Sequence, residues 1–246
     1  MASKRYLFTV EYDGTDYCGW QRQNNGISVQ AKIEQALFDV TNNKAAIVGS
    51  GRTDAGVHAL AQAFHVDLDT PIPAEKLPYA LNTVLPDDIR IKSCKKVSRE
   101  FNARFGAKQK TYLYKMYVSR HASATRQRTH LHVVPPIDLS RMRLAAQNIV
   151  GVHDFKCFLA ANSQVKSTVR EVYSLTFVKH CDELIMKITG NGFLYNMVRI
   201  IVGTLLDVGR GKIEPQEVAD IIASGKRAKA GRTVAPQGLY LYKINY

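Results

Sequence analysis

The chain has 246 residues, enough for one large domain or two modest ones, and 46% of them are hydrophobic. Lys and Arg number 34 against 21 Asp and Glu, and the resulting net charge of +13 favours a polyanionic partner: nucleic acid, an anionic membrane or an acidic protein. No apolar run is long enough to span a membrane. Scattered cysteines and no signal peptide predict reduced thiols in a cytoplasmic protein. Many basic proteins bind no anionic partner, but at this size and charge we favour nucleic acid.

Hydrophobic periodicity and turn residues predict the elements of the first half. Ser28 suits the N-cap of a helix that carries Ile33 and Leu37 at helical spacing. The predicted order is a strand over 5–12, this helix over 29–40, a buried strand over 45–48, a helix over 74–85 and a strand over 89–97. The basic stretch 98–110 follows, and a domain boundary near Gly106 gives halves 1–106 and 107–246.

The second half also mixes strands with helices. The predicted order is a strand over 111–118, a polar mobile loop over 120–132, a helix over 139–150 closed by Gly151, a hairpin of 171–178 and 183–189, helices over 197–208 and from Pro215 to Gly225, and a strand over 239–244. Because helices and hairpins occur together in both halves, the pattern predicts an α+β fold rather than a doubly wound one.

The segment 49–60, GSGRTDAGVHAL, is the most unusual stretch of the chain. Its three glycines allow the backbone to approach a ligand closely, and Arg52 stands two residues before Asp54. A carboxylate beside an arginine stays ionised near neutral pH and can act as a nucleophile or a base. The alternative is a tight turn in which Asp54 caps a backbone amide, and composition alone favours that alternative.

A second unusual segment, 190–211, places Arg199 near the start of a strongly apolar helix. This arginine either extends along the surface to solvent, which is common, or points inward and holds a carboxylate. Nucleotide-binding loops are excluded, because the third glycine of a dinucleotide fingerprint is missing and Gly211-Lys212 is followed by Ile213 rather than Ser or Thr. The histidines and cysteines match no common zinc spacing, so no metal is expected.

Taken together, six segments resemble the tRNA pseudouridine synthase A family. In family order they are YDGTDYCGWQRQ (12–23), GSGRTDAGVHAL (49–60), FNARFGAKQKTYLY (101–114), GVHDFKCF (151–158), GNGFLYNMVRIIVGTLLDVGRG (190–211) and GRTVAPQGLYL (231–241). They span nearly the whole chain, and the RTDAGVH block is highly specific. The resemblance implies an isomerase that converts uridine to pseudouridine at tRNA positions 38, 39 and 40, in the anticodon arm, without cofactor or metal.

The resemblance also implies an architecture and partners. Two α+β halves, each with a mainly antiparallel sheet and flanking helices, would face one another across a basic catalytic cleft, as in the pseudouridine synthase fold. The enzyme would act on tRNA as a homodimer in the cytoplasm, with no membrane partner.

Site residues are carried over position by position. Asp54 matches the family's catalytic aspartate, and Arg199 matches the arginine that pairs with it. Tyr112 matches the tyrosine that stacks on the target base. Arg52 matches the arginine that helps to extrude the target nucleotide, and Leu239 matches an apolar wall of the pocket.

Basic side chains are expected to contact the RNA backbone without base specificity. They are Arg22, Arg99, Arg104, Lys108, Lys110, Arg126 and Arg128. The chain departs from the family at Leu113, where an arginine is often present. We expect this departure to cost a backbone or phosphate contact and to spare catalysis.

Other functions are weighed against this one. A sister pseudouridine synthase that acts at other RNA positions would share the catalytic block, so only mapping of the modified site discriminates it. A non-catalytic RNA-binding protein or chaperone has no physical need to keep Asp54, Tyr112 and Arg199 together. A nucleotide-dependent enzyme would need a phosphate loop, which the sequence lacks.

Overall fold

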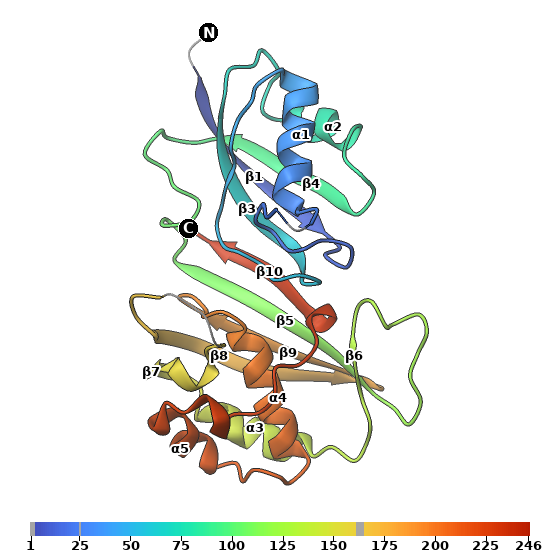
Figure 1. Ribbon diagram of the computed structural model, residues 1–246, viewed down its shortest axis with the longest axis vertical. Coiled ribbons are helices and arrows are strands. Elements are labelled where there is room, and N and C mark those ends of the chain that lie inside the picture. The colour runs from blue at the N-terminus through green and yellow to red at the C-terminus, as the bar shows by residue number, and fades with distance from the viewer. Residues whose placement is uncertain (1–2, 25, 161–164) are drawn as a thin grey trace. The chain divides into compact units, whose positions relative to one another are not determined.

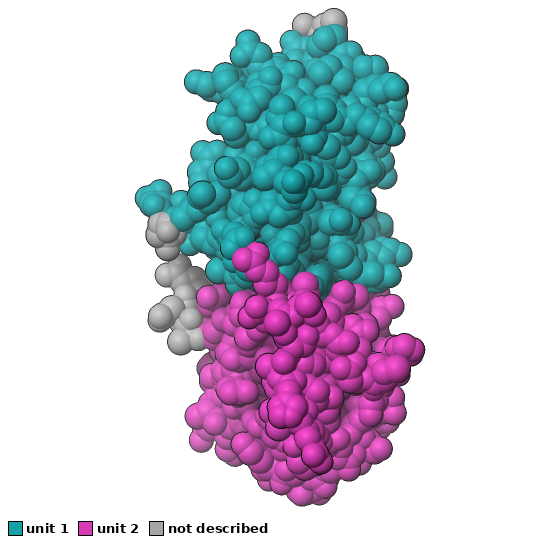
Figure 2. All heavy atoms as spheres, turned by 90° about the vertical axis from the view of Figure 1, so that its right-hand side faces the viewer, with its two compact units in different colours: residues 1–108, 240–246 teal, residues 109–239 magenta. Residues whose placement is uncertain are grey.

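The computed structural model describes residues 3–24, 26–160 and 165–246, and it divides into two compact units. Unit 1 comprises Met1–Lys108 and Tyr240–Tyr246, and unit 2 comprises Gln109–Leu239 (Figures 1 and 2). Each unit combines strands of a mainly antiparallel sheet with helices, which confirms the α+β prediction.

Unit 1 is built around strand β1 (Lys4–Tyr12). It pairs antiparallel with β4 (Ile89–Lys96) on one side and with β3 (His58–Leu68) on the other. The short β2 (Val48–Gly49) also pairs antiparallel with β3, while β10 (Leu239–Asn245) runs parallel to β3. Helices α1 (Val29–Thr41) and α2 (Leu77–Asn82) cover one face of this sheet (Figure 1).

Helix α1 forms where its cap and apolar spacing predict. The Ser28 hydroxyl oxygen accepts a hydrogen bond from the Ala31 amide at 3.2 Å, so one donor of the first turn is satisfied. Val29, Ile33 and Leu37 are completely buried against the sheet. The helix ends at Asn42, whose backbone is left-handed (φ 55°), a conformation that asparagine tolerates better than most residues.

Three predictions in unit 1 need correction. The buried strand over 45–48 is reduced to the pair Val48–Gly49, and Val48 is exposed. Helix α2 has six residues instead of the twelve predicted over 74–85. Leu77, Leu81 and Leu85 are all buried, but Leu85 lies in the turn after the helix, and Val84 is exposed. Strand β3 was not predicted, although it is the longest strand of unit 1.

Unit 2 has the strand order β5 (Gln109–Val118), β9 (Glu183–Gly190), β8 (Val169–His180), β7 (Gly151–Asp154), all antiparallel. Strand β6 (Leu131–Val133) adds a parallel partner to β5. The predicted hairpin of β8 and β9 is confirmed. Its turn contains Cys181 with a positive φ of 52°. Strand β7 was not predicted.

Helices α3 (Leu139–Gln147), α4 (Met197–Gly209) and α5 (Glu217–Ser224) pack together against the sheet of unit 2 (Figure 1). Unit 2 also has three short 3₁₀ turns: η1 (Phe155–Phe158) between β7 and β8, and η2 (Arg227–Lys229) and η3 (Pro236–Gly238) between α5 and β10. The predicted helices over 197–208 and towards Gly225 are confirmed. Helix α3 stops three residues before its predicted end, and Gly151 opens β7 with φ 116° instead of closing the helix.

The loop over 120–132 contacts the hairpin of unit 2. Arg126 pairs with Asp182 at 2.8 Å and lies over the ring of Tyr117, while His130 contacts Glu183 at 2.9 Å. The end of the loop forms β6. These contacts give the loop a defined path, and whether it moves stays a prediction.

The predicted halves 1–106 and 107–246 also stay a prediction, because compactness does not establish that either unit folds or acts on its own. The observed units differ from those halves at the C-terminus. Residues 240–246 group with unit 1, since Tyr240 and Leu241 pair with β3. In the described ranges, no helix is long and apolar enough to cross a bilayer.

Candidate functional site

The loop that carries Asp54 is anchored to β3 by buried polar side chains. The Ser50 amide donates to the Ala63 carbonyl at 2.8 Å, and its hydroxyl donates to the Gln62 side chain at 2.6 Å. The Gln62 amide in turn donates to the Gly51 carbonyl at 2.9 Å. Ser50 and Gln62 are both fully buried, so this network fixes the start of the loop.

The motif at 12–23 supports the same loop from the other side. The Trp20 amide donates to the Thr53 carbonyl at 3.0 Å, and the hydroxyls of Thr53 and Tyr12 are 2.8 Å apart. A Cβ on Gly19, which has φ 109°, would lie 2.6 Å from the Thr53 carbonyl oxygen, and a Cβ on Gly49 would lie 2.4 Å from Trp20 Nε1. Two motifs separated in sequence therefore form one structure through close approaches that require glycine.

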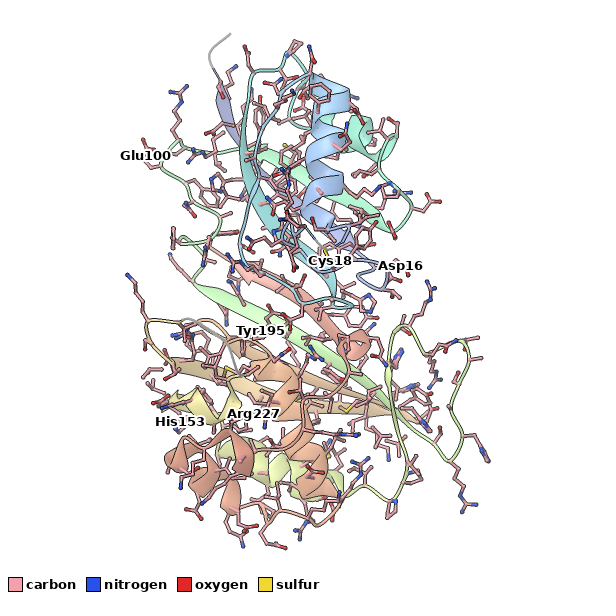
Figure 3. The ribbon with its side chains drawn as sticks, in the orientation of Figure 1. Asp16, Cys18, Glu100, His153, Tyr195 and Arg227 are labelled. Carbon is pink, nitrogen blue, oxygen red and sulfur yellow. The ribbon has the colours of Figure 1, made fainter. Side chains whose placement is uncertain are left out.

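The segment 13–24, in which Figure 3 labels Asp16 and Cys18, contacts the start of α1, where the amides of Val29 and Gln30 donate to the Gly19 and Trp20 carbonyls. The Tyr17 hydroxyl donates to Asp88 at 2.7 Å, and its pKa is raised by burial first and by the Asp88 contact second. The Cys18 amide donates to the Ile27 carbonyl at 2.9 Å. These bonds connect the segment to Asp88, just before β4, and to Ile27, just before α1.

Asp54 is the first residue of a tight turn within its loop. Its carbonyl accepts a hydrogen bond from the Val57 amide at 3.1 Å, and Gly56 has φ 74°. Asp54 is half-buried, while Arg52 and Ala55 are exposed. The turn suggested by composition therefore exists in the backbone. A rigid turn that leaves the carboxylate partly accessible is also what a catalytic carboxylate needs.

In unit 2, Tyr112 and Tyr114 point to the same face of β5, because side chains alternate along a strand. Tyr112 is 8% exposed, and its ring meets Phe193 edge-on at 5.2 Å. The buried Tyr114 hydroxyl donates to the Ala235 carbonyl at 2.6 Å. Burial raises the pKa of Tyr114, while the charge of Arg199 acts in the opposite direction.

Arg199 is the third residue of α4 and is half-buried rather than extended to solvent. Its Nε donates to the Val234 carbonyl at 2.7 Å, and its Nη1 donates to the Asn196 side-chain oxygen at 2.7 Å. Asn196 is able to accept because its backbone is left-handed (φ 59°) at the start of the helix. Two bonds on different nitrogens fix the plane of the guanidinium group.

The segment 231–239 lies along α4 at distances that only glycine permits. A Cβ on Gly203 would be 1.9 Å from the Arg232 carbonyl oxygen, and one on Gly231 would be 2.5 Å from the Thr204 amide. The Gly231 amide donates to the Thr204 hydroxyl at 2.8 Å. A Cβ on Gly238 would be 2.6 Å from the Lys115 carbonyl oxygen. This packing places the Val234 carbonyl beside its donor Arg199 and the Ala235 carbonyl beside its donor, the Tyr114 hydroxyl.

Arg227, labelled in Figure 3, donates hydrogen bonds to the beginning of this segment. Its Nη1 donates to the Gly231 carbonyl at 2.9 Å, and its Nη2 donates to the Thr233 hydroxyl at 3.2 Å. At the other end, the buried Leu239 follows η3. Arg227 therefore supports the stretch of backbone that binds Arg199.

The five predicted site residues divide between the units. Arg52 and Asp54 share one loop of unit 1, while Tyr112, Arg199 and Leu239 belong to unit 2. The pairing of Asp54 with Arg199 joins the two units and stays a prediction, as do the five roles.

Three supporting residues of unit 2 were missed by sequence reasoning. The alternation of Tyr112 and Tyr114 could have indicated Tyr114. Asn196 and Arg227 gave no signal. Their partners Arg199 and Gly231 are near in sequence, but no motif marks an asparagine or an arginine for such a supporting contact. Within the ranges that the structure describes, no three His, Cys, Asp or Glu side chains gather as a group that could hold a metal.

The chain matches the family described as tRNA pseudouridine synthase over residues 8–106 and 145–246. It belongs to that family. Asp54, Arg199 and Leu239 fall within the matched ranges, while Tyr112 and Tyr114 lie in the stretch between them.

Curated relatives named tRNA pseudouridine synthase A match this chain along almost its whole length. One from Thermoanaerobacter sp. (strain X514) is 48% identical over 99% of this chain and 100% of its own. One from Ruminiclostridium cellulolyticum is 47% identical with the same coverage, and one from Bacillus pumilus is 45% identical over 97% of each chain.

A solved archaeal box H/ACA Nop10–Cbf5 complex contains a chain with 11% sequence identity and a TM-score of 0.37, matched over 82% of this chain and 43% of that one. This similarity is too low to carry any argument. The sequence relatives support the assignment without it. As a tRNA pseudouridine synthase, the protein is an isomerase that forms pseudouridine in tRNA.

Proposed function

We propose that this synthase modifies uridines 38, 39 and 40 in the anticodon arm of tRNA, with Asp54 as its catalytic carboxylate. The observation that carries the proposal is the identity of 44–48% to six tRNA pseudouridine synthase A sequences over at least 96% of this chain. The proposal extends to action as a homodimer in the cytoplasm, without metal or cofactor.

The reaction exchanges one bond for another within the same nucleotide. The target base leaves its stack, which costs a few kcal/mol. The bond between C1′ and N1 breaks, uracil rotates in the pocket, and C1′ bonds to C5. The proton on C5 is then lost and N1 gains one, so atoms and charge balance without an oxidant or a second substrate.

Asp54 assists the first step either by attacking C1′ or by removing a ribose proton, and its negative charge is needed in both cases. Arg199 pairs with this carboxylate and keeps it ionised and oriented. The bonds of Arg199 to Val234 and Asn196 support this role, because an arginine with a fixed plane orients a carboxylate better than a mobile one.

The remaining three residues handle the nucleotide. Tyr112 stacks on the target base, Arg52 helps to extrude it, and Leu239 forms an apolar wall of the pocket. The exposed position of Arg52 on the same rigid loop as Asp54 suits a side chain that meets the RNA first. The burial of Tyr112 and Leu239 suits a pocket that excludes water.

Site mapping tests the proposed positions. Three tRNA transcripts, each with a single anticodon-arm uridine at position 38, 39 or 40, would be incubated with the protein. A fourth, with uridine only outside the arm, serves as the control. Pseudouridine would be located by carbodiimide modification and primer extension. We expect stops in the first three transcripts only, and modification of the control alone would establish a sister synthase instead.

A further inference from the structure

The connection between β4 and β5 displays an aromatic ring to solvent. Phe105 is 81% exposed, more than any other large hydrophobic side chain of the residues that the structure describes. Single exposed apolar side chains are common on protein surfaces, so the case for a binding role depends on the support and the charges around this ring.

The turn beneath the ring is tightly built. The Asn102 side-chain oxygen accepts hydrogen bonds from the amides of Arg104 at 2.9 Å and Phe105 at 3.1 Å. The Asn102 carbonyl accepts from the Gly106 amide at 2.8 Å. Because all three bonds are made by one residue, the backbone that carries Phe105 has a single defined course.

The base of the turn is anchored in the core of unit 1. Ala103 is completely buried, and its amide donates to Nδ1 of the buried His65 at 3.0 Å. The Tyr246 hydroxyl donates to the Ala103 carbonyl at 3.0 Å, and the Phe101 ring packs on the Tyr246 ring at 4.9 Å. The exposed ring therefore projects from a fixed support and loses little freedom on binding.

One cation lies over the ring, and others stand on the same segment of the chain. The Arg104 guanidinium lies over the Phe105 ring at 5.6 Å from its centre. Arg99 and Lys108 are exposed on the same segment, which carries one carboxylate, Glu100 (labelled in Figure 3). An arginine over an exposed aromatic ring among further cations is the combination that binds a nucleobase and its phosphate.

A protein partner fits this surface less well. Stable protein interfaces bury about 800 Å² per partner around an apolar centre that is depleted of charge. Phe105 is the one strongly exposed large hydrophobic side chain in the described segment 98–108, and cations flank it. A lone ring among cations suits a flat, negatively charged ligand.

We propose that Phe105 is a stacking platform for an unpaired base of the RNA substrate, with Arg104 on the neighbouring phosphate. The inference rests on the proposed function only in taking tRNA as the partner. It assigns a contact on unit 1 that is separate from the loop of Asp54. Phe105 would contribute to affinity and to the choice of RNAs with unpaired bases, while the chemical step would be unaffected.

Binding of Phe105→Ala to three RNAs tests the proposal: tRNA, a single-stranded oligouridine and a blunt duplex of equal length. Stacking on one base is worth enough that we expect the Kd for the first two to rise at least about 5-fold and the Kd for the duplex to stay unchanged. An equal loss on all three RNAs, or no loss on any, would overturn the proposal.

Tyr79→Ala is the matched control. Tyr79 is 73% exposed and has Lys76 Nζ 5.9 Å from its ring centre, so its local chemistry is similar. It lies on α2, where the exposed carboxylate of Glu75 precedes the helix and opposes RNA binding, and where Asp87 pairs with Arg90. We expect Tyr79→Ala to bind all three RNAs like the wild type. Neither Phe105→Ala nor Tyr79→Ala should change the melting temperature, because each variant removes an exposed ring.

Phe105→Trp gives a direct signal of stacking. The only natural tryptophan, Trp20, is 3% exposed and supplies a constant background. We expect the fluorescence of the new indole to be quenched by oligouridine and to be unaffected by polyphosphate, which has charge without bases. Quenching by neither ligand or by both equally would overturn the stacking role.

Light scattering of Phe105→Ala excludes the remaining explanation. A change in oligomeric state would make the ring a contact between copies and overturn the proposal, and an unchanged state supports it. Failure of the proposed function can be distinguished from failure of the stacking proposal. If the wild type modified other positions, only the mapping result would change, while the binding and fluorescence results would stand.

Discussion

Arg199 connects the start of α4 to the backbone at Val234, and this contact gives its replacement two separate effects. We expect Arg199→Ala to abolish pseudouridine formation and to lower the free energy of unfolding by about 1.5–3 kcal/mol, the usual worth of hydrogen bonds from a charged group. A completely buried pair would cost about 3–5 kcal/mol, but this side chain is only half-buried. Urea denaturation and a turnover assay measure the two effects.

Arg199→Lys is the control, because it keeps the charge and loses the geometry of Nε and Nη1. We expect it to recover part of the stability and little of the activity. An Arg199→Ala variant with unchanged unfolding would mean that the contacts with Val234 and Asn196 contribute nothing.

His65 makes the stability of unit 1 depend on pH. Burial lowers its pKa first, and the charge of Arg5 lowers it further, against a smaller opposing effect of Asp67. Folding therefore favours the neutral ring, so its contribution is present above the unfolded pKa of about 6.5 and is lost as pH falls through the folded value. Protonated Nδ1 could no longer accept the Ala103 amide.

We expect the urea midpoint of the wild type to fall between pH 7.5 and pH 5 by more than that of His65→Gln, whose side chain does not titrate. Equal falls in both proteins would assign the pH dependence to other groups.

At the scale of elements, the sequence predicts the helices and strands whose signals are local. The Ser28 cap and the spacing of Ile33 and Leu37 predict α1 correctly. Strand β3 escaped prediction because residues on both of its faces are buried, so HALAQAFHVDL lacks the alternation of a half-buried strand. The support of Arg199 escaped for two reasons. Its bond to the Val234 carbonyl is long-range, and no motif marks Asn196 or Arg227 for their short-range contacts.

The close approach of α4 to the segment 231–239 is testable through glycine. We expect Gly203→Ala to lower the free energy of unfolding by about 1–3 kcal/mol, because its Cβ would meet the Arg232 carbonyl oxygen at 1.9 Å and force the backbones apart. Gly192→Ala is the control in the same unit, since its Cβ would meet only the Arg170 side chain at 3.7 Å. Equal stability of the two variants would contradict this packing.

At the scale of the molecule, the net charge of +13 predicts RNA binding that depends on salt. Among the basic residues expected to contact phosphates, Arg22 pairs with Glu34 and Arg126 with Asp182, and these ion pairs compete with phosphate. For about five phosphate contacts, affinity for tRNA should fall by about 10²–10³-fold between 50 and 200 mM salt. Fluorescence anisotropy measures this, and an affinity independent of salt would contradict the assignment of these residues.

The family and the α+β fold could be read from the sequence, because motifs such as RTDAGVH and the pattern of hairpins and helices are local. The support of the Asp54 loop could not, since Tyr12 and Trp20 reach it from a distant part of the chain. The catalytic role of Asp54 rests on the resemblance to a family, and the proposed function depends on this residue more than on any other.

Tritium release from tRNA labelled at C5 of uridine, with the wild type and Asp54→Asn side by side, tests that dependence most directly. Asp54→Asn preserves size and removes the charge. We expect release by the wild type alone, with tRNA affinity largely unchanged in the variant. Release by both proteins, or loss of binding together with activity, would contradict a catalytic Asp54 and leave it as part of a structural turn.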